Sequence, residues 1–212
     1  MGEVLLTNQD HPSEDVLSRA VYELAAGGVV VMPTDSVYGI GCAAFAGNPA
    51  HQRIFSIKHR DPSQTLPWLV ADFDDLTRYA VELPSSAFEL VTHFWPGALT
   101  LVVRASEQVS PEYRGADGTI ALRMPDSHLV RELSRRVGMP LATTSANTHG
   151  EAAATSGSGV EARIVAEADL TLDAGPAPLA IASTIVSLVG TEPRVLREGA
   201  IPAHQIIKIA RV

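Results

Sequence analysis

Residues 27–36 read Gly-Gly-Val-Val-Val-Met-Pro-Thr-Asp-Ser, and this stretch decides the fold class. Its centre, Val29–Met32, is a short run of apolar and mostly β-branched residues between a glycine pair and a proline, which is typical of a fully buried strand. Pro33 ends the strand, and Thr34-Asp35-Ser36 follow it. Open α/β sheets bind ligands at the carboxyl ends of such strands, so these polar side chains indicate a site.

Helical and extended segments alternate along the rest of the chain. Ser13 is a suitable N-cap for a helix that runs to about Ala26, and further helices are expected at 49–58, 74–80, 85–93, 127–136, 160–166 and 202–209. Strands are expected at 29–32, 66–70, 99–103, 119–123, 140–143, 170–173, 183–188 and 194–197. This alternation predicts an α/β fold with a twisted sheet flanked by helices. The late strands have little helix between them, which predicts a mixed sheet.

Composition narrows the class of protein. The chain has 212 residues, 46% of them apolar, which suits a single domain over residues 1–212. Its formal net charge of -8 argues against a nonspecific duplex binder, although a local basic pocket is compatible with it. Cys42 is the only cysteine in the sequence, as suits a reducing cytoplasm. The N-terminus is acidic and the apolar runs are short, so we expect a cytoplasmic protein without a membrane partner.

Several motifs of common enzymes are absent from the sequence. It contains no G-x-x-x-x-G-K-[ST] phosphate loop, no H-E-x-x-H or similar metal-binding spacing, and no G-x-S-x-G nucleophile elbow. Residues 39–44 match the G-x-G-x-x-A dinucleotide pattern, with Asp61 about 20 residues further on. That pattern requires a helix to begin at once, and Gly47-Asn48-Pro49 interrupts it. We therefore expect neither a nicotinamide cofactor nor a metal held by the protein alone.

Polar clusters at the ends of predicted segments carry the functional prediction. Each has an ordinary structural explanation, since turns favour Pro, Asp and Ser, and helix C-termini favour basic residues. Together, so many hydroxyl, amide and guanidinium groups at segment ends indicate one polar cavity suited to phosphates. The clusters are Thr34-Asp35-Ser36, Lys58-His59-Arg60, Arg123, Thr143-Thr144-Ser145-Ala146-Asn147, Ser183-Thr184 and Arg197-Glu198-Gly199.

In order and spacing, these clusters resemble the threonylcarbamoyl-AMP synthase family, the YrdC-like proteins. The resemblance extends roughly over residues 12–208, and its specificity comes from many modest motifs in the family's order. It implies the short, single-domain form of a YrdC-like fold, with a concave and positively lined cavity. The matching segments are Pro33–Gly41, Lys58-His59-Arg60, Leu66-Pro67, Phe94–Thr100, Arg123-Met124-Pro125, Thr144–Asn147, Ser183–Val186 and Arg197-Glu198-Gly199.

The resemblance also implies an activity. An L-threonylcarbamoyladenylate synthase is a nucleotidyltransferase that forms threonylcarbamoyl-AMP and pyrophosphate from ATP, L-threonine and bicarbonate, for the modification of tRNA. On this basis tRNA and downstream threonylcarbamoyl-transferase proteins are expected partners. Mg²⁺ is expected to arrive bound to ATP.

Residue roles follow from the same resemblance, which places the family's K-x-R and S-x-N residues at Lys58, Arg60, Ser145 and Asn147. Lys58 and Arg60, both expected to be exposed in the cavity, are predicted to be catalytic because they would neutralise the triphosphate and bicarbonate. The residues predicted to bind ATP are Lys58, Arg60, Thr143, Ser145, Asn147 and Arg197. Those predicted to bind L-threonine are Thr34, Arg123 and Ser183.

Two positions depart from the family's pattern. Gln64-Thr65 stand where many members have a Lys-Pro pair, and His149-Gly150 stand where the family usually has Ser-Gly. If the missing charge weakens the phosphate clamp, Gln64→Lys should tighten ATP binding.

Two other classes of function remain open. The first is a non-catalytic paralogue that binds nucleotide, or double-stranded RNA by its shape, through the same concave surface. The second is carbamoyl transfer, as in larger hydrogenase-maturation proteins. It is disfavoured because the sequence carries no acylphosphatase-like or zinc-finger segment.

Overall fold

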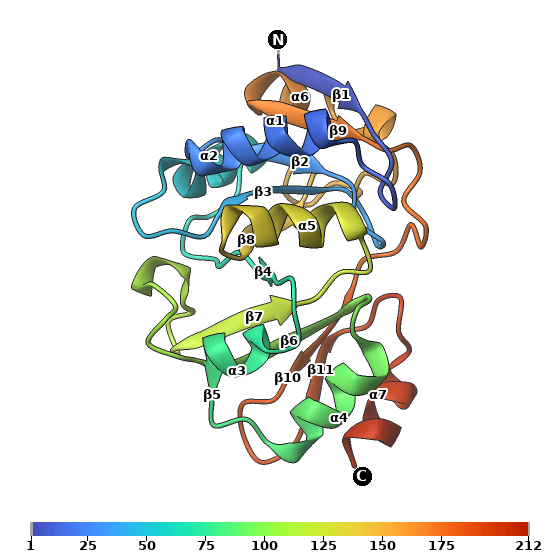
Figure 1. The fold of residues 1–212 in the computed structure, drawn as a ribbon. Helices are drawn as coiled ribbons and strands as arrows, with labels where there is room; N and C mark the ends of the chain where they lie inside the picture. The colour runs from blue at the N-terminus through green and yellow to red at the C-terminus, as the bar shows by residue number, and fades with distance from the viewer. Residues whose placement is uncertain (1, 212) are drawn as a thin grey trace.

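The computed structural model describes residues 2–211, which form a mixed sheet with helices on both faces (Figure 1). The strand order is β1-β9-β2-β3-β8-β4-β7-β6-β10-β11, and β5 pairs with β6 beside this path. Parallel pairs such as β1–β9 and antiparallel pairs such as β3–β8 both occur, so the predicted α/β class and mixed sheet are confirmed. The strands are β1 (Glu3–Leu6), β2 (Val30–Met32), β3 (Gly39–Ala43), β4 (Trp68–Leu69), β5 (Ala80–Val81), β6 (Leu99–Ala105), β7 (Thr119–Arg123), β8 (Leu141–Ser145), β9 (Leu170–Asp173), β10 (Thr184–Ser187) and β11 (Arg194–Arg197).

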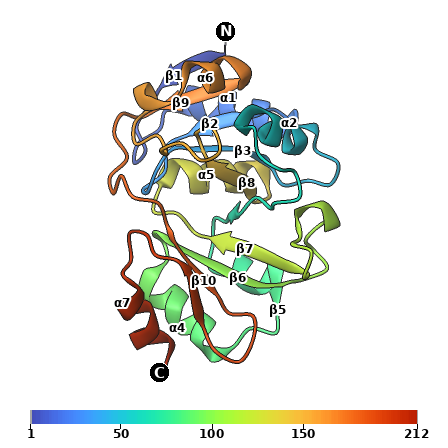
Figure 2. The ribbon, with the colours of Figure 1, turned by 180° about the vertical axis from the view of Figure 1, so that it is seen from behind.

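The helices lie on both faces of the sheet. On one face α1 (Glu14–Ala25) packs against α5 (His128–Val137), and on the other α2 (Pro49–Lys58) lies beside α6 (Ala162–Glu167) (Figures 1 and 2). Three further helices lie by the part of the sheet that ends in β11: α3 (Asp75–Tyr79), α4 (Ser85–Phe94) and α7 (Ala203–Ala210). There α3 contacts β5, α4 contacts β6, and α4 packs against α7. Within residues 2–211, no helix has both the length and the apolar character needed to cross a bilayer.

Local sequence signals produce most of these elements as predicted. Ser13 caps α1, where its Oγ accepts a hydrogen bond from the Val16 N–H at 3.4 Å. All of β2 is buried, as its unbroken apolar run requires. The predicted bounds of α2, β7, β9 and β11 agree residue for residue with the structure, and those of the other predicted elements agree to within two residues at each end.

Three strands were not predicted: β1, β3 and β5. The largest consequence concerns β3, which runs antiparallel between β2 and β8 and contains the glycines of the apparent dinucleotide motif. A Cβ at Gly39 would lie 2.6 Å from Thr143 Cγ2, and one at Gly41 would collide with Thr143 Oγ1. The two glycines therefore let the Thr143 side chain of β8 lie flat against β3. The rejection of a dinucleotide loop agrees with this strand geometry.

Candidate active site

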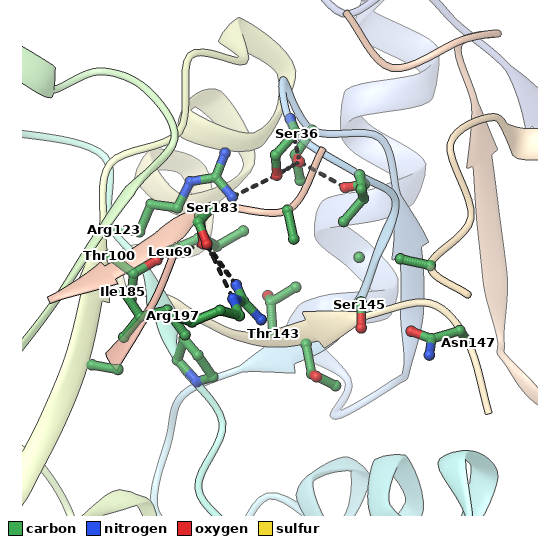
Figure 3. A pocket seen from close by; sticks show the side chains of 18 of the residues that line it. Ser36, Leu69, Thr100, Arg123, Thr143, Ser145, Asn147, Ser183, Ile185 and Arg197 are labelled. Carbon is green, nitrogen blue, oxygen red and sulfur yellow. Dashed lines mark hydrogen bonds between the residues drawn. The ribbon is translucent and has the colours of Figure 1, made fainter. Parts of the chain in front are cut away.

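A cavity of about 580 Å³ lies over one face of the sheet and extends from β3 to β11. Its wall includes every residue that the sequence predicted for the site, and Figure 3 shows several of these side chains around it. It also includes mid-strand residues such as Val102 and Ala121, so the cavity covers more of the sheet than its strand ends. The predicted residues brought together are Thr34, Lys58, Arg60, Arg123, Thr143, Ser145, Asn147, Ser183 and Arg197.

The charge of this wall is opposite to that of the whole chain. Four cationic side chains, those of Lys58, Arg60, Arg123 and Arg197, face the cavity, whereas Glu151 contributes the one carboxylate of the described lining. The chain carries a net charge of -8. Concentrated cations in a concave site attract anions far more strongly than the mean charge of a protein suggests. The arrangement suits a polyanionic ligand.

Lys58 is the last residue of α2, and its ammonium is held by the exit of β8. Its Nζ donates to Ser145 O at 2.5 Å and to Asn147 O at 2.6 Å. Only 2% of the residue is exposed, so the prediction that Lys58 is exposed in the cavity is wrong. Burial, reinforced by the nearby charge of Arg60, lowers the pKa of Lys58 to about 8. The side chain both adds charge to the wall and fixes the segment 145–147.

Arg60 follows Lys58 after a sharp change of direction. His59 adopts a left-handed conformation, with φ of 51°, and ends the helix between the two cations. Arg60 is partly exposed, as predicted. Its Nη1 donates to Thr144 Oγ1 at 3.1 Å, so α2 and β8 are joined a second time beside the cavity.

Arg123 ends β7 and is buried in an ion pair that the sequence did not predict. Its Nη2 donates to Asp35 Oδ1, its Nη1 to Ser36 Oγ at 2.7 Å, and its Nε to Gly97 O at 3.0 Å. Burial raises the pKa of Asp35, and the charge of Arg123 opposes that rise. Arg123 is therefore a buried residue of the cavity wall and not a charge at the surface edge of the sheet. Asp35, in the same triplet as Thr34, is the residue whose part in the site was missed.

A chain of hydroxyl groups continues from Arg123 into the loop after β2. The Thr34 hydroxyl donates to Val37 O at 2.7 Å and accepts from the Ser36 N–H at 3.1 Å. Ser36 Oγ lies 3.0 Å from Thr34 Oγ1, and because the single Thr34 hydroxyl proton is donated to Val37 O, the Ser36 hydroxyl is the donor of this bond. The Thr34 hydroxyl is thus fully used within the loop. A direct contact with substrate would have to replace one of these bonds.

Ser183 and Arg197 also line the cavity, where hydrogen bonds join them (Figure 3). Arg197 Nη2 donates to Ser183 O at 2.7 Å, and the Ser183 hydroxyl lies 2.9 Å from Thr100 Oγ1. These bonds tie β11 and β6 to the start of β10. Both groups are therefore held in place on the strands of the sheet.

The polar side chains of β8 and of the loop after it are of two kinds: some are hydrogen-bonded within the protein, and one is not. Asn147 Nδ2 donates to Thr148 O at 2.9 Å and Glu151 O at 2.8 Å, and the Thr143 hydroxyl donates to Leu141 O at 3.1 Å. Ser145 also lines the cavity, and its hydroxyl has no hydrogen bond to another of the described residues 2–211. The Ser145 hydroxyl is the member of this group most open to a ligand.

Fold and cavity together define a class of protein: an α/β protein that holds a polar, polyanionic ligand in a cationic cavity on the face of its sheet. A family model for Sua5, YciO and YrdC, described as telomere recombination, matches residues 23–199. The chain therefore belongs to the Sua5/YciO/YrdC family, as the motifs predicted.

Individual relatives agree with this membership. A protein of Mycobacterium leprae is 38% identical over 196 residues, which are 92% of this chain and 88% of that protein. The threonylcarbamoyl-AMP synthase of Bacillus subtilis is 32% identical over 95% of this chain and 58% of its own length. The crystal structure of Sua5 from Pyrococcus abyssi complexed with L-threonine matches with a TM-score of 0.91 and 32% identity. It covers 97% of this chain, and the chain spans 60% of it.

Proposed function

We propose that this protein is a threonylcarbamoyl-AMP synthase, an enzyme that forms threonylcarbamoyl-AMP and pyrophosphate from ATP, L-threonine and bicarbonate. The observation that carries the proposal is the convergence of four cations and several hydroxyl groups from distant parts of the chain in one cavity. Relatives at 32% identity and above bear the name of this enzyme, and a related structure holds its amino-acid substrate.

The chemistry of the reaction explains why such a cavity suffices. The amine of threonine adds to bicarbonate with loss of water, or to CO₂ with loss of a proton, and gives a carbamate. A carbamate oxygen then attacks the α-phosphorus of ATP. The bond from the α-phosphorus to the bridging oxygen breaks, and pyrophosphate leaves with that electron pair. Negative charge accumulates on phosphate oxygens throughout, so cations that are already in position stabilise the transition state. No protein nucleophile is required, because binding side by side brings the reactants together.

The two ends of the cavity suit different parts of the substrates. Arg60 and Lys58, at the end of α2, would neutralise the triphosphate and the bicarbonate, while Ser145 and Arg197 would hold the nucleotide. Arg123 keeps two N–H groups without an acceptor among residues 2–211, which suits a pair of hydrogen bonds to the carboxylate of threonine. Thr34 would act on the same substrate through the order that it gives to Ser36.

Mg²⁺ enters this proposal as part of the ATP complex. Among residues 2–211 no group of three or more His, Cys, Asp or Glu side chains could hold a metal ion, and Glu151 alone supplies a carboxylate to the described lining. ATP phosphates coordinate Mg²⁺ while the ion retains several waters, so the protein needs no cage of its own. When bound, the ion would offset phosphate charge, and the cationic side chains would act alongside it.

The adenylate product is a reactive mixed anhydride, so it requires a protein that transfers the threonylcarbamoyl group to tRNA. A threonylcarbamoyl-transferase and tRNA are therefore the partners that we propose downstream. The alternative function, binding of nucleotide or double-stranded RNA without catalysis, is not favoured. Relatives of this chain by sequence carry the enzyme's name.

Pyrophosphate release tests the proposal. Purified protein is incubated with Mg²⁺–ATP and bicarbonate, with and without L-threonine, and pyrophosphate is measured over time. The proposal expects release that depends on threonine and bicarbonate. ATP binding without any threonine-dependent release would refute the synthase activity and favour the binding paralogue.

A further inference from the structure

Gln64 lines the cavity from the loop after α2, beside Arg60. Local contacts shape this loop. Because His59 is left-handed, the Arg60 N–H returns to Phe55 O at 2.9 Å, and the chain turns away from the helix. The Gln64 N–H then donates to Asp61 O at 3.2 Å and closes a turn. The turn brings the Gln64 side chain back to Arg60.

Three acceptors hold the Arg60 guanidinium. Its Nε–H donates to Gln64 Oε1 at 2.6 Å, its Nη2 to Thr65 O at 3.0 Å, and its Nη1 to Thr144 Oγ1 at 3.1 Å. An Arg Nε–H can only donate, so the atom of Gln64 that faces it must be the amide oxygen. Arg60 Cζ also lies over the ring of Phe55, 5.8 Å from the ring centroid. The guanidinium is thereby fixed in plane and direction.

The bond to Gln64 differs from the other two in the nitrogen that it uses. All three bonds restrain rotation of the planar guanidinium, but the bond to Gln64 takes the Nε–H and so uses no N–H of the terminal nitrogens, which Thr65 and Thr144 each engage once. One N–H on each terminal nitrogen has no acceptor among residues 2–211. Two such groups on a fixed plane match two oxygens of a phosphate. The acceptor is also neutral, so it orients Arg60 without offsetting its charge.

We propose that Gln64 is a positioning residue that orients Arg60 toward the phosphates of ATP. This inference rests on the proposed function in that it takes ATP as the ligand. It changes the expectation for Gln64→Lys, because an ammonium at this position cannot accept from Arg60 Nε and would repel the guanidinium. The charge that lysine adds to the cavity is offset by the disorder that it introduces at Arg60. Gln64→Lys should therefore give no tighter ATP binding.

A double-mutant cycle on ATP affinity tests the proposal. Gln64→Met keeps the length of the side chain and removes the acceptor, and it should weaken ATP binding about fivefold with an unchanged melting temperature. In an Arg60→Ala background the same change should have no further effect, because Gln64 acts through Arg60. Gln52→Met is the matched control, since Gln52 is an exposed glutamine of α2 outside the cavity.

The outcomes separate this inference from the proposed function. Equal weakening by Gln64→Met with and without Arg60, no weakening at all, or tighter binding by Gln64→Lys would overturn the positioning role, even if the enzyme turns over. Coupled weakening in a protein that binds ATP but releases no threonine-dependent pyrophosphate would support the positioning role and reject the synthase. A wild-type protein that does not bind ATP would reject both.

Discussion

Arg123 and Arg60 line the same cavity but are held in opposite ways. Arg123 is buried and pairs with a carboxylate, that of Asp35, whereas Arg60 is partly exposed and is held by the neutral acceptors Gln64, Thr65 and Thr144. An arginine whose charge is already balanced acts mainly as a shaped pair of donors. An arginine held by neutral groups keeps its charge for a ligand.

This difference divides the cavity into two regions of distinct chemistry. The Arg123 region, with Asp35, Ser36 and Thr34, is rigid and nearly neutral, as suits a zwitterionic amino acid. The end of α2, with Lys58 and Arg60, has no carboxylate bonded to either cation among residues 2–211, as suits a triphosphate. The two regions of the cavity therefore suit different substrates, the Arg123 region the amino acid and the end of α2 the triphosphate.

The largest effect, a loss of stability, is expected when the ion pair between Arg123 and Asp35 is removed. Arg123→Ala leaves Asp35 buried without its partner, which should lower the free energy of unfolding by about 3–5 kcal/mol. Denaturant unfolding measures this loss. Replacing both partners, as in Arg123→Met with Asp35→Leu, should restore most of the stability, because no buried charge then remains. A loss of less than about 1 kcal/mol in Arg123→Ala would show that the pair is not desolvated as described.

A substitution at the end of α2 should weaken ATP binding and leave the stability of the fold unchanged. Arg60→Ala removes a charge-assisted contact to phosphate worth about 1.5–3 kcal/mol, so kcat/KM for ATP should fall at least about tenfold. Arg53→Ala is the matched control, since Arg53 lies on the same helix and pairs with Asp169 outside the cavity. Steady-state kinetics with both variants decides the matter. Equal activity of Arg60→Ala and wild type would contradict the assignment of this region to the triphosphate.

The selectivity of the enzyme for threonine over serine and valine tests whether the Arg123 region binds the amino acid. Serine keeps the hydroxyl of threonine and lacks its methyl, a difference of about 1–3 kcal/mol in kcat/KM. Valine lacks the hydroxyl and should be rejected more strongly, because a buried polar partner is left without a bond. Pyrophosphate release with each amino acid gives the ranking. Similar rates with valine and threonine would mean that no group in this region binds the substrate hydroxyl.

A pH dependence of stability is also expected from Lys58. Burial holds the pKa of Lys58 at about 8 in the folded protein, below its ordinary value of 10.5. Below pH 8 both states are protonated and the folded state carries the full burial penalty. Between about pH 8 and 10.5 the folded state loses its proton first, so the free energy of unfolding should rise by about 3 kcal/mol over that range. The difference in unfolding free energy between wild type and Lys58→Met should show this rise, whereas a constant difference over that range would contradict it.

Sequence predicted the members of the site better than their bonding. The nine predicted residues all line the cavity. A single polar cluster has an ordinary structural explanation, so the site was predicted from the number of clusters and from their resemblance, in order and spacing, to the family's motifs. The Asp35–Arg123 pair and the burial of Lys58 were not predicted, since their partners lie 88 and 87–89 residues away in the chain. The nearest signal was the carboxylate of Asp35 within a polar triplet at the end of β2, opposite in charge to the arginine that ends β7.

The fold shows a parallel limit. Strands rich in β-branched residues, such as β2, were predicted, whereas β3 was missed because Gly39 and Gly41 have low strand propensity. Glycine is required at both positions because any side chain there would collide with Thr143 on the neighbouring β8. A contact between strands so far apart in the sequence cannot be predicted from the local sequence pattern. Tertiary packing overrides propensity at this position, next to the cavity.

If one cavity joins threonine, bicarbonate and ATP, the product of the reaction carries the carbon of bicarbonate. Protein incubated with Mg²⁺–ATP, L-threonine and ¹³C-bicarbonate is analysed at once by mass spectrometry. We expect threonylcarbamoyl-AMP that carries the label, in amounts that fall at least about tenfold in Arg60→Ala and stay unchanged in Arg53→Ala. If a folded wild-type protein that binds ATP forms no labelled adenylate, the protein is not a threonylcarbamoyl-AMP synthase.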